Sequence, residues 1–143
     1  MVIQLHDVYG GHHVKQVDVD FLYEVLKDRP EEANISHREL PTPEQHKQFV
    51  HRRPYECWYI IQHQSQDGRT TTRLGATYIS KSREVGLFLL REHWGEGYAK
   101  RALELLRANH PGRLLANVAP GNERSHRFFK AAGGRLIQQT YEL

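Results

Sequence analysis

The stretch Glu84-Val-Gly-Leu-Phe-Leu-Leu90, followed by Arg91-Glu-His-Trp-Gly-Glu-Gly-Tyr-Ala99, decides the fold. Its first part reads as a short apolar strand, and its second part is a turn with glycines at 95 and 97. An amphipathic helical pattern follows at once and runs to residue 109. A glycine turn between a strand and a helix leaves backbone N–H groups unpaired, and these donors and the helix dipole together attract an anion. The sequence therefore predicts binding of a phosphorylated cofactor.

Three interpretations of this turn compete. Glycines between a strand and a helix are common as plain connections. A dinucleotide fingerprint needs a third glycine at position 100, where Lys100 stands, and a further βαβ unit behind it. A phosphate loop of the Walker type is excluded because the chain has no Gly-Lys-Ser or Gly-Lys-Thr. The third interpretation depends on the residues that flank the turn.

Two motifs carry a family resemblance. Glu92-His-Trp-Gly-Glu-Gly-Tyr-Ala99 resembles the acetyl-CoA signature of the GNAT acetyltransferase superfamily, Q/R-x-x-G-x-G/A, in the form found in ribosomal-protein N-terminal and amino-sugar acetyltransferases. Asn122-Glu-Arg-Ser-His-Arg-Phe-Phe-Lys-Ala-Ala-Gly133 resembles the superfamily's second signature. The two motifs stand in the expected order, and the resemblance covers residues 55–143 and, more loosely, residues 14–52.

The chain departs from the family pattern at three positions. Glu92 stands where Gln or Arg is usual, so an acidic group would face a pyrophosphate unless it turns outward. Phe129 stands where many members carry a tyrosine as general acid, which puts the protonation step in question. Gly134 replaces the usual phenylalanine after Gly133.

The expected fold is α+β, in a single acetyltransferase domain of residues 1–143. The resemblance implies a GNAT-like mixed, mainly antiparallel central sheet of six to seven strands flanked by about four helices. The expected strands are residues 14–17, 55–63, 69–80, 84–90, 113–118 and 135–141. The expected helices are one capped by Asp18, one opened by a capping box of Thr42 and Gln45, and residues 99–109 and 121–132. The family's usual last strand is short or missing, which leaves an edge that a second copy would cover in a homodimer.

The resemblance implies acetyl-CoA as the cofactor. It places a backbone N–H near Leu89 or Leu90 beside the thioester carbonyl, where residues 84–90 and 113–118 splay apart to receive the pantetheine arm. The residues expected to bind the cofactor are Phe88, Leu89, Leu90, Trp94, Gly95, Glu96, Gly97, Tyr98, Ala99, Asn122, Ser125 and Phe129.

Acetyl transfer to an amine needs a base for the amine proton and a proton donor for the departing thiolate. Glu84 is the candidate base because the family often has a carboxylate at the start of this strand; the alternative is a solvated carboxylate paired with Arg83 or Lys81. Ser125 is the candidate partner of the thiolate, since Phe129 carries no donor; the alternative is a hydroxyl bonded to its own backbone. Tyr78 is a reserve candidate for either role.

The sequence says less about the part of the domain that binds the acetyl acceptor. Residues 34–46 and 55–59 look similar to the acceptor half of amino-sugar acetyltransferases that act on nucleotide-linked sugars, and Tyr78 and His37 are the candidate substrate-binding residues. The expected function is an N-acetyltransferase that moves an acetyl group from acetyl-CoA to a primary amine by direct attack in a ternary complex. A protein amino terminus is the rival acceptor. A non-catalytic acyl-CoA-binding domain, acting as sensor or subunit, is the alternative that Phe129 motivates.

Composition agrees with a small soluble enzyme. The chain has 143 residues, 38% of them hydrophobic, a net charge of +3 and no apolar run of membrane-spanning length. Basic and acidic residues are interspersed, so we expect neither a nucleic-acid nor a membrane partner. Cys57 is the only cysteine and no signal peptide is evident, which favours the cytoplasm. The ten histidines show no metal-ligand spacing, so we expect no metal.

Overall fold

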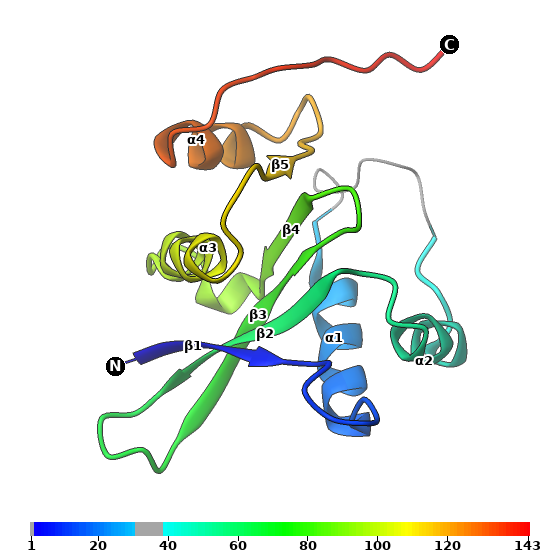
Figure 1. The fold of residues 1–143 in the computed structure, drawn as a ribbon, viewed down its shortest axis with the longest axis vertical. Coiled ribbons are helices and arrows are strands. Elements are labelled where there is room, and N and C mark those ends of the chain that lie inside the picture. Colours follow the sequence, from blue (N-terminus) through cyan, green and yellow to red (C-terminus); the bar gives the residue numbers. More distant parts are fainter. Residues whose placement is uncertain (1, 31–38) are drawn as a thin grey trace.

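A mixed sheet of five strands, in the order β1-β2-β3-β4-β5, runs through the centre of the protein (Figure 1). The structure is a computed structural model that describes residues 2–30 and 39–143. The strands are β1 (Val2–Asp7), β2 (Cys57–Gln64), β3 (Thr71–Ile79), β4 (Glu84–Leu89) and β5 (Leu115–Ala116). The first three pairings are antiparallel and the last, between β4 and β5, is parallel. The α+β class is as expected, but the described chain forms five strands rather than six to seven.

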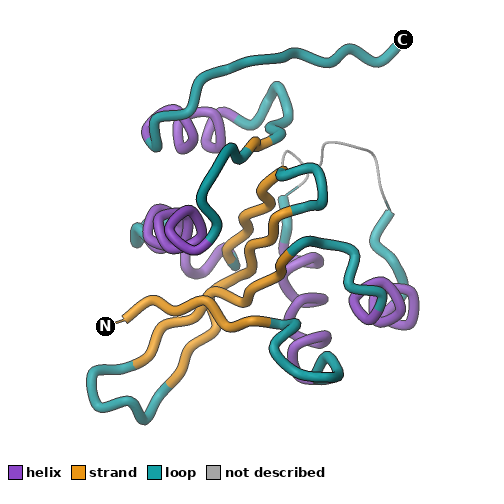
Figure 2. Tube along the Cα trace, in the orientation of Figure 1, coloured by secondary structure: helices purple, strands orange, loops and turns teal. Residues whose placement is uncertain are grey.

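Helices cover both faces of the sheet (Figure 2). On one face α1 (Gln16–Asp28) and α2 (Pro43–His51) pack on a core that includes Leu22, Val50, Trp58 and Ile60. On the other face α3 (Tyr98–Asn109) packs Ala102 and Leu106 against a second group of strand residues that includes Cys57, Ile61, Leu74 and Ile79. The fourth helix, α4 (Glu123–Ala131), lies near β5 (Figure 1). In the part of the chain that is described, no helix combines the length and the apolar character needed to cross a bilayer.

Local sequence signals explain several of these elements. Thr42 caps α2 and forms the expected capping box: its hydroxyl accepts the Gln45 N–H at 3.2 Å, and the Gln45 side chain accepts the Thr42 N–H at 2.9 Å. Asp67 and Gly68 form the hairpin turn between β2 and β3. The Asp67 carboxylate accepts the Ser65 hydroxyl at 2.6 Å, and Gly68 has a φ of +72°. The second helix is thus confirmed as predicted.

The predictions for the N-terminal part were wrong in two respects. Residues 14–17 do not form a strand, and the first strand is β1 instead. Asp18 does not cap α1, because Lys15 occupies the N-cap position. Asp18 is buried in the first turn, where it accepts from Arg73 at 2.7 Å and lies 2.9 Å from His6 Nε2. These contacts hold α1 against β1 and β3, so long-range ion pairing decided the place of this carboxylate.

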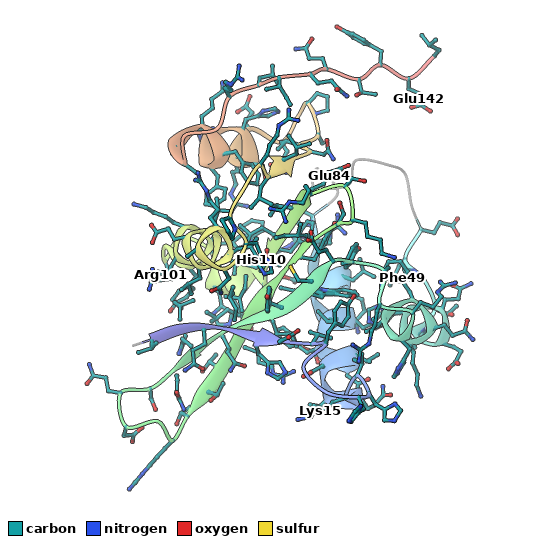
Figure 3. The ribbon with its side chains drawn as sticks, in the orientation of Figure 1. Lys15, Phe49, Glu84, Arg101, His110 and Glu142 are labelled. Carbon is teal, nitrogen blue, oxygen red and sulfur yellow. The ribbon has the colours of Figure 1, made fainter. Side chains whose placement is uncertain are left out.

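The C-terminal part also differs from the prediction. The strand expected at residues 113–118 is limited to the two residues of β5, and residues 135–141 form no strand. Leu136, Ile137 and Tyr141 are exposed in an extended segment that runs beyond α4 and carries Glu142 (Figure 3). These residues have the composition of a strand, but no neighbouring strand of the described chain pairs with them.

Candidate active site

A cavity of about 410 Å³ opens where β4 and β5 separate. The two strands pair only at Glu84 with Leu115 and at Val85 with Ala116. Beyond this point β4 continues to Leu89, whereas the chain after β5 leads to α4 (Figure 1). The cavity follows β4 along this whole length. The splayed strands that the resemblance implied are therefore present.

The glycine turn lies beside this cavity. After a short 3-10 helix, η2 (Arg91–His93), Gly95 and Gly97 adopt left-handed φ angles of +83° and +82°. Apart from the glycine and its own chain neighbours, no heavy atom of the described residues lies within 4 Å of the position that a Cβ would take at either glycine. Gly97 is the N-cap of α3 and offers no side-chain cap. No side chain shields the backbone at Gly95 and Gly97, so this turn fits the pyrophosphate of an acyl-CoA.

Glu92 turns away from the glycine turn. Its side chain is 73% exposed, and its carboxylate lies 3.6 Å from His93 Nε2. It borders a shallow hollow on the α1 side together with Glu24, Lys27 and Asp28. The departure from the family pattern at this position therefore leaves the anion site without a carboxylate from Glu92.

The backbone hydrogen bonds of β4 distinguish the N–H groups of Leu89 and Leu90, the two candidate donors to the thioester carbonyl. The Leu90 N–H donates to the Leu74 carbonyl at 2.9 Å, so it is occupied. Backbone groups alternate between the two edges of a strand, and Leu89 therefore directs its N–H towards the edge that β5 has left. The Leu89 carbonyl, on that same edge, accepts the Trp94 indole N–H at 3.0 Å. Leu89 is the donor that the geometry favours.

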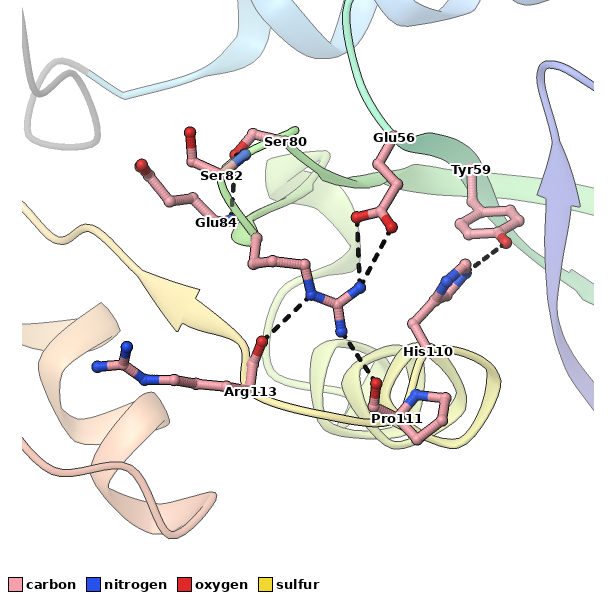
Figure 4. A network of polar contacts seen from close by, with 9 residues as sticks. Glu56, Tyr59, Ser80, Ser82, Glu84, His110, Pro111 and Arg113 are labelled. Carbon is pink, nitrogen blue, oxygen red and sulfur yellow. Dashed lines mark hydrogen bonds and ion pairs between the residues drawn. The ribbon is translucent and has the colours of Figure 1, made fainter.

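Glu84 lies at the start of β4 (Figure 3). It is one of the residues that line the cavity. Its N–H donates to Ser80 Oγ at 3.1 Å, and its carboxylate accepts a hydrogen bond from the Asn117 side chain. The alternative pairing with Arg83 is not formed, because Arg83 binds Glu56 at 3.3 Å (Figure 4). Nor does any ion pair join Glu84 to Lys81 within the described ranges. The carboxylate is thus held by a neutral amide at the cavity.

The wall opposite β4 comes from α4. Asn122 caps this helix by accepting the Ser125 N–H at 3.3 Å. Ser125, Phe128 and Phe129 line the cavity, and α4 has no buried residue. The apolar stripe of α4 therefore faces the cavity rather than a packed core. Phe129 presents a ring where a tyrosine hydroxyl would be usual.

Two tyrosines form the wall on the α1 and α2 side. Tyr78 stacks on Tyr55 with ring centres 3.8 Å apart and planes 6° apart. The Tyr78 ring lies so close over Gly86 that a Cβ there would come within 2.1 Å of it. Burial and the neighbouring Tyr78 raise the pKa of Tyr55, which therefore stays a neutral phenol. Tyr78 is thus placed as a wall residue, whereas His37 lies outside the described residues.

The cavity brings together most of the predicted cofactor residues. Those that line it are Phe88, Leu89, Trp94, Ala99, Asn122, Ser125 and Phe129. Gly95, Glu96, Gly97 and Tyr98 form the adjacent turn and the start of α3, and Leu90 lies at the hollow on the α1 side. Sequence reasoning missed Asn117 and Arg124. Arg124 stands inside the second motif and could have been considered, whereas nothing local marks Asn117.

Comparisons with known proteins agree with this architecture. Residues 12–135 match the family described as "Acetyltransferase (GNAT) domain". A crystal structure of a domain from Methanocaldococcus jannaschii is similar with a TM-score of 0.72 at 17% identity, covering 99% of this chain and 93% of that one. An acetyltransferase from Thermus thermophilus is similar with a TM-score of 0.67 at 23% identity, covering 96% and 90%. No curated protein matches the chain. These identities show the fold alone, but the family match spans most of the sequence, and the chain belongs to the GNAT acetyltransferase family.

Proposed function

We propose that the protein transfers an acetyl group from acetyl-CoA to a primary amine by direct attack in a ternary complex. One observation carries this proposal: a single cavity follows β4 from Glu84 to Leu89 and adjoins the open glycine turn. A carboxylate that can accept a proton, a backbone donor and an anion site are thereby aligned along one strand. Family membership supports acyl transfer from an acyl-CoA in general.

The donor side would hold acetyl-CoA, which supplies the acetyl group as a thioester. Gly95 and Gly97 allow the N–H groups at the start of α3 to approach the pyrophosphate. The free edge of β4 offers hydrogen bonds to the amides of the pantetheine arm. The N–H of Leu89 is placed to donate to the thioester carbonyl as negative charge develops on its oxygen.

On the acceptor side, Glu84 takes the proton of the amine, directly or through water, so that the nitrogen lone pair can attack the carbonyl carbon. Asn117 orients this carboxylate by donating to it. The carbon–sulfur bond breaks as the amide forms, and the sulfur receives a proton from Ser125 or from water. In this step the Phe129 ring only shapes the cavity wall, because it has no proton to donate.

The acceptor in this proposal is an amino sugar, including a nucleotide-linked one, or a protein amino terminus. Tyr55 and Tyr78 support this class because both line the cavity that Glu84 also lines, and each carries a hydroxyl group. Such neutral donors suit sugar hydroxyls or peptide carbonyls.

Release of coenzyme A, measured with a panel of amino sugars, nucleotide-linked amino sugars and short peptides, tests the proposal. We expect turnover with at least one of these amines and none when the amine is already acetylated. Tight binding of acetyl-CoA without turnover on any amine would instead support a non-catalytic acyl-CoA-binding domain that acts as sensor or subunit.

A further inference from the structure

Arg124 lies flat against Trp94 at the edge of the glycine turn. Its guanidinium carbon is 3.6 Å from the centre of the indole ring, and both side chains line the cavity. The ring is itself fixed by the hydrogen bond from its N–H to the Leu89 carbonyl. Trp94 directly precedes Gly95, so the guanidinium stacks on the residue next to the glycine turn.

The turn itself is poor in positive charge. Residues 94–99 hold one carboxylate, Glu96, and no lysine or arginine, and Glu92 turns away from them. The arginine nearest in sequence, Arg91, is engaged elsewhere: its N–H donates to the Asp28 carboxylate at 2.7 Å and its Nε to the Asp28 carbonyl at 3.0 Å. A diphosphate at this turn would draw its counter-charge from the flanking helices, where Lys100 of α3 and Arg124 of α4 are the candidates.

Two neighbouring arginines of α3 and α4 already have carboxylate partners. Arg101 binds Glu104 at 3.3 Å, and Arg127 lies 3.8 Å from Glu123. Within residues 2–30 and 39–143, no carboxylate forms an ion pair with Arg124. The stacked guanidinium thus keeps its positive charge available to a ligand at the turn.

We propose that Arg124 binds the diphosphate of the acyl-CoA and thereby selects a thioester on a phosphorylated carrier over the same thioester on bare pantetheine. This inference rests on the proposed function. A guanidinium can keep one face on an indole while its edge donates two N–H groups to phosphate oxygens, which a lysine cannot reproduce. Arg124 would in this way add from α4 a positive charge that residues 94–99 do not carry.

The test compares acetyl-CoA with S-acetylpantetheine, which has no phosphate, as ligands in titration calorimetry. For Arg124→Gln we expect acetyl-CoA to bind about tenfold more weakly, or ~1.4 kcal/mol, and S-acetylpantetheine to bind within about twofold of the unmodified protein. Arg124→Lys should fall between the two. Arg127→Gln is the matched control on the same helix, and it should change neither affinity.

Two further outcomes decide against the inference. Equal losses for both thioesters in Arg124→Gln would show that the arginine only holds α4 in place. Unchanged affinity for acetyl-CoA, with an unchanged dependence on salt concentration, would show that the diphosphate does not meet this group. If the unmodified protein bound neither thioester, the proposed function would fail and this inference with it, whereas normal binding by the unmodified protein isolates the role of Arg124.

Discussion

At the scale of single residues, the reaction depends most on Glu84. Its carboxylate lines the cavity and accepts a hydrogen bond from Asn117, while the nearby cation Arg83 is bound to Glu56. Glu84→Gln keeps the shape and removes the proton acceptor, so we expect kcat near neutral pH to fall by ~100-fold. The acidic limb of the pH–rate profile should flatten in the same variant. A variant that keeps the unmodified rate from pH 6 to 9 would show that water or another group is the base.

Ser125 is expected to matter less than Glu84. It lines the cavity beside Phe129, whose ring cannot donate a proton. A thiol with an ordinary pKa of about 8.5 leaves well without help near neutral pH. We therefore expect Ser125→Ala to lower kcat by about 3- to 30-fold, and Phe129→Tyr to be tolerated. Steady-state kinetics of both variants with the true acceptor checks this. Full activity of Ser125→Ala would leave water as the donor.

At the scale of elements, His46 joins α2 to α1. Its Nε2 lies 2.9 Å from the Val19 carbonyl, and only 4% of the residue is exposed. Burial lowers the pKa of His46, so the folded protein holds this ring neutral while the unfolded chain binds a proton near its ordinary pKa of ~6.5. The stability that this ring contributes is complete above that pH and is lost as pH falls through the folded pKa, at up to ~1.4 kcal/mol per pH unit.

Urea unfolding of the protein between pH 7.5 and 5 measures this loss. We expect His46→Leu to lower the free energy of unfolding at pH 7.5 and to make it less dependent on pH. His51→Asn, at an exposed position of the same helix, is the control and should keep the unmodified pH dependence. If His46→Leu kept the same slope with pH, other titrating groups would account for it.

Local chemistry explains which elements the sequence could predict. The capping box at Thr42, which formed as expected, and the turn at Asp67 are each complete within a few residues. Asp18 satisfies the local rule for an N-cap, yet its partners His6 and Arg73 come from two different strands. Residues 135–141 have strand composition, but a strand also needs a second strand to pair with. The sequence pattern of these residues does not reveal whether such a strand is present.

The same distinction applies to the site. The glycine turn and the cavity lining of α4 follow from motifs that are contiguous in sequence. Asn117 enters the site only because β5 stops after two residues, and the choice of Leu89 over Leu90 depends on the register with β3. Such features are set by pairing between distant segments and therefore become visible only in three dimensions.

At the scale of the whole molecule, two residue pairs between β4 and β5 join the C-terminal part to the sheet. A ligand in the cavity would contact both β4 and α4 and so add to this junction. We expect acetyl-CoA at about 100 times its Kd to raise stability by ~2.7 kcal/mol, and to slow amide hydrogen exchange in α4 more than in α1. Equal protection of both helices, measured by mass spectrometry, would contradict a role in this junction.

The short contact between β4 and β5 also bears on how such a protein can evolve. Each further residue pair between β4 and β5 would satisfy more backbone N–H and C=O groups and would raise thermal tolerance. It would also close the cavity in which the reaction takes place. Selection for activity and selection for heat resistance therefore favour opposite changes in the pairing between β4 and β5. Variants recovered from a screen for heat resistance alone should accumulate substitutions that extend the pairing between β4 and β5. A catalyst that also tolerates heat would have to gain its extra stability in the hydrophobic cores on either side of the sheet.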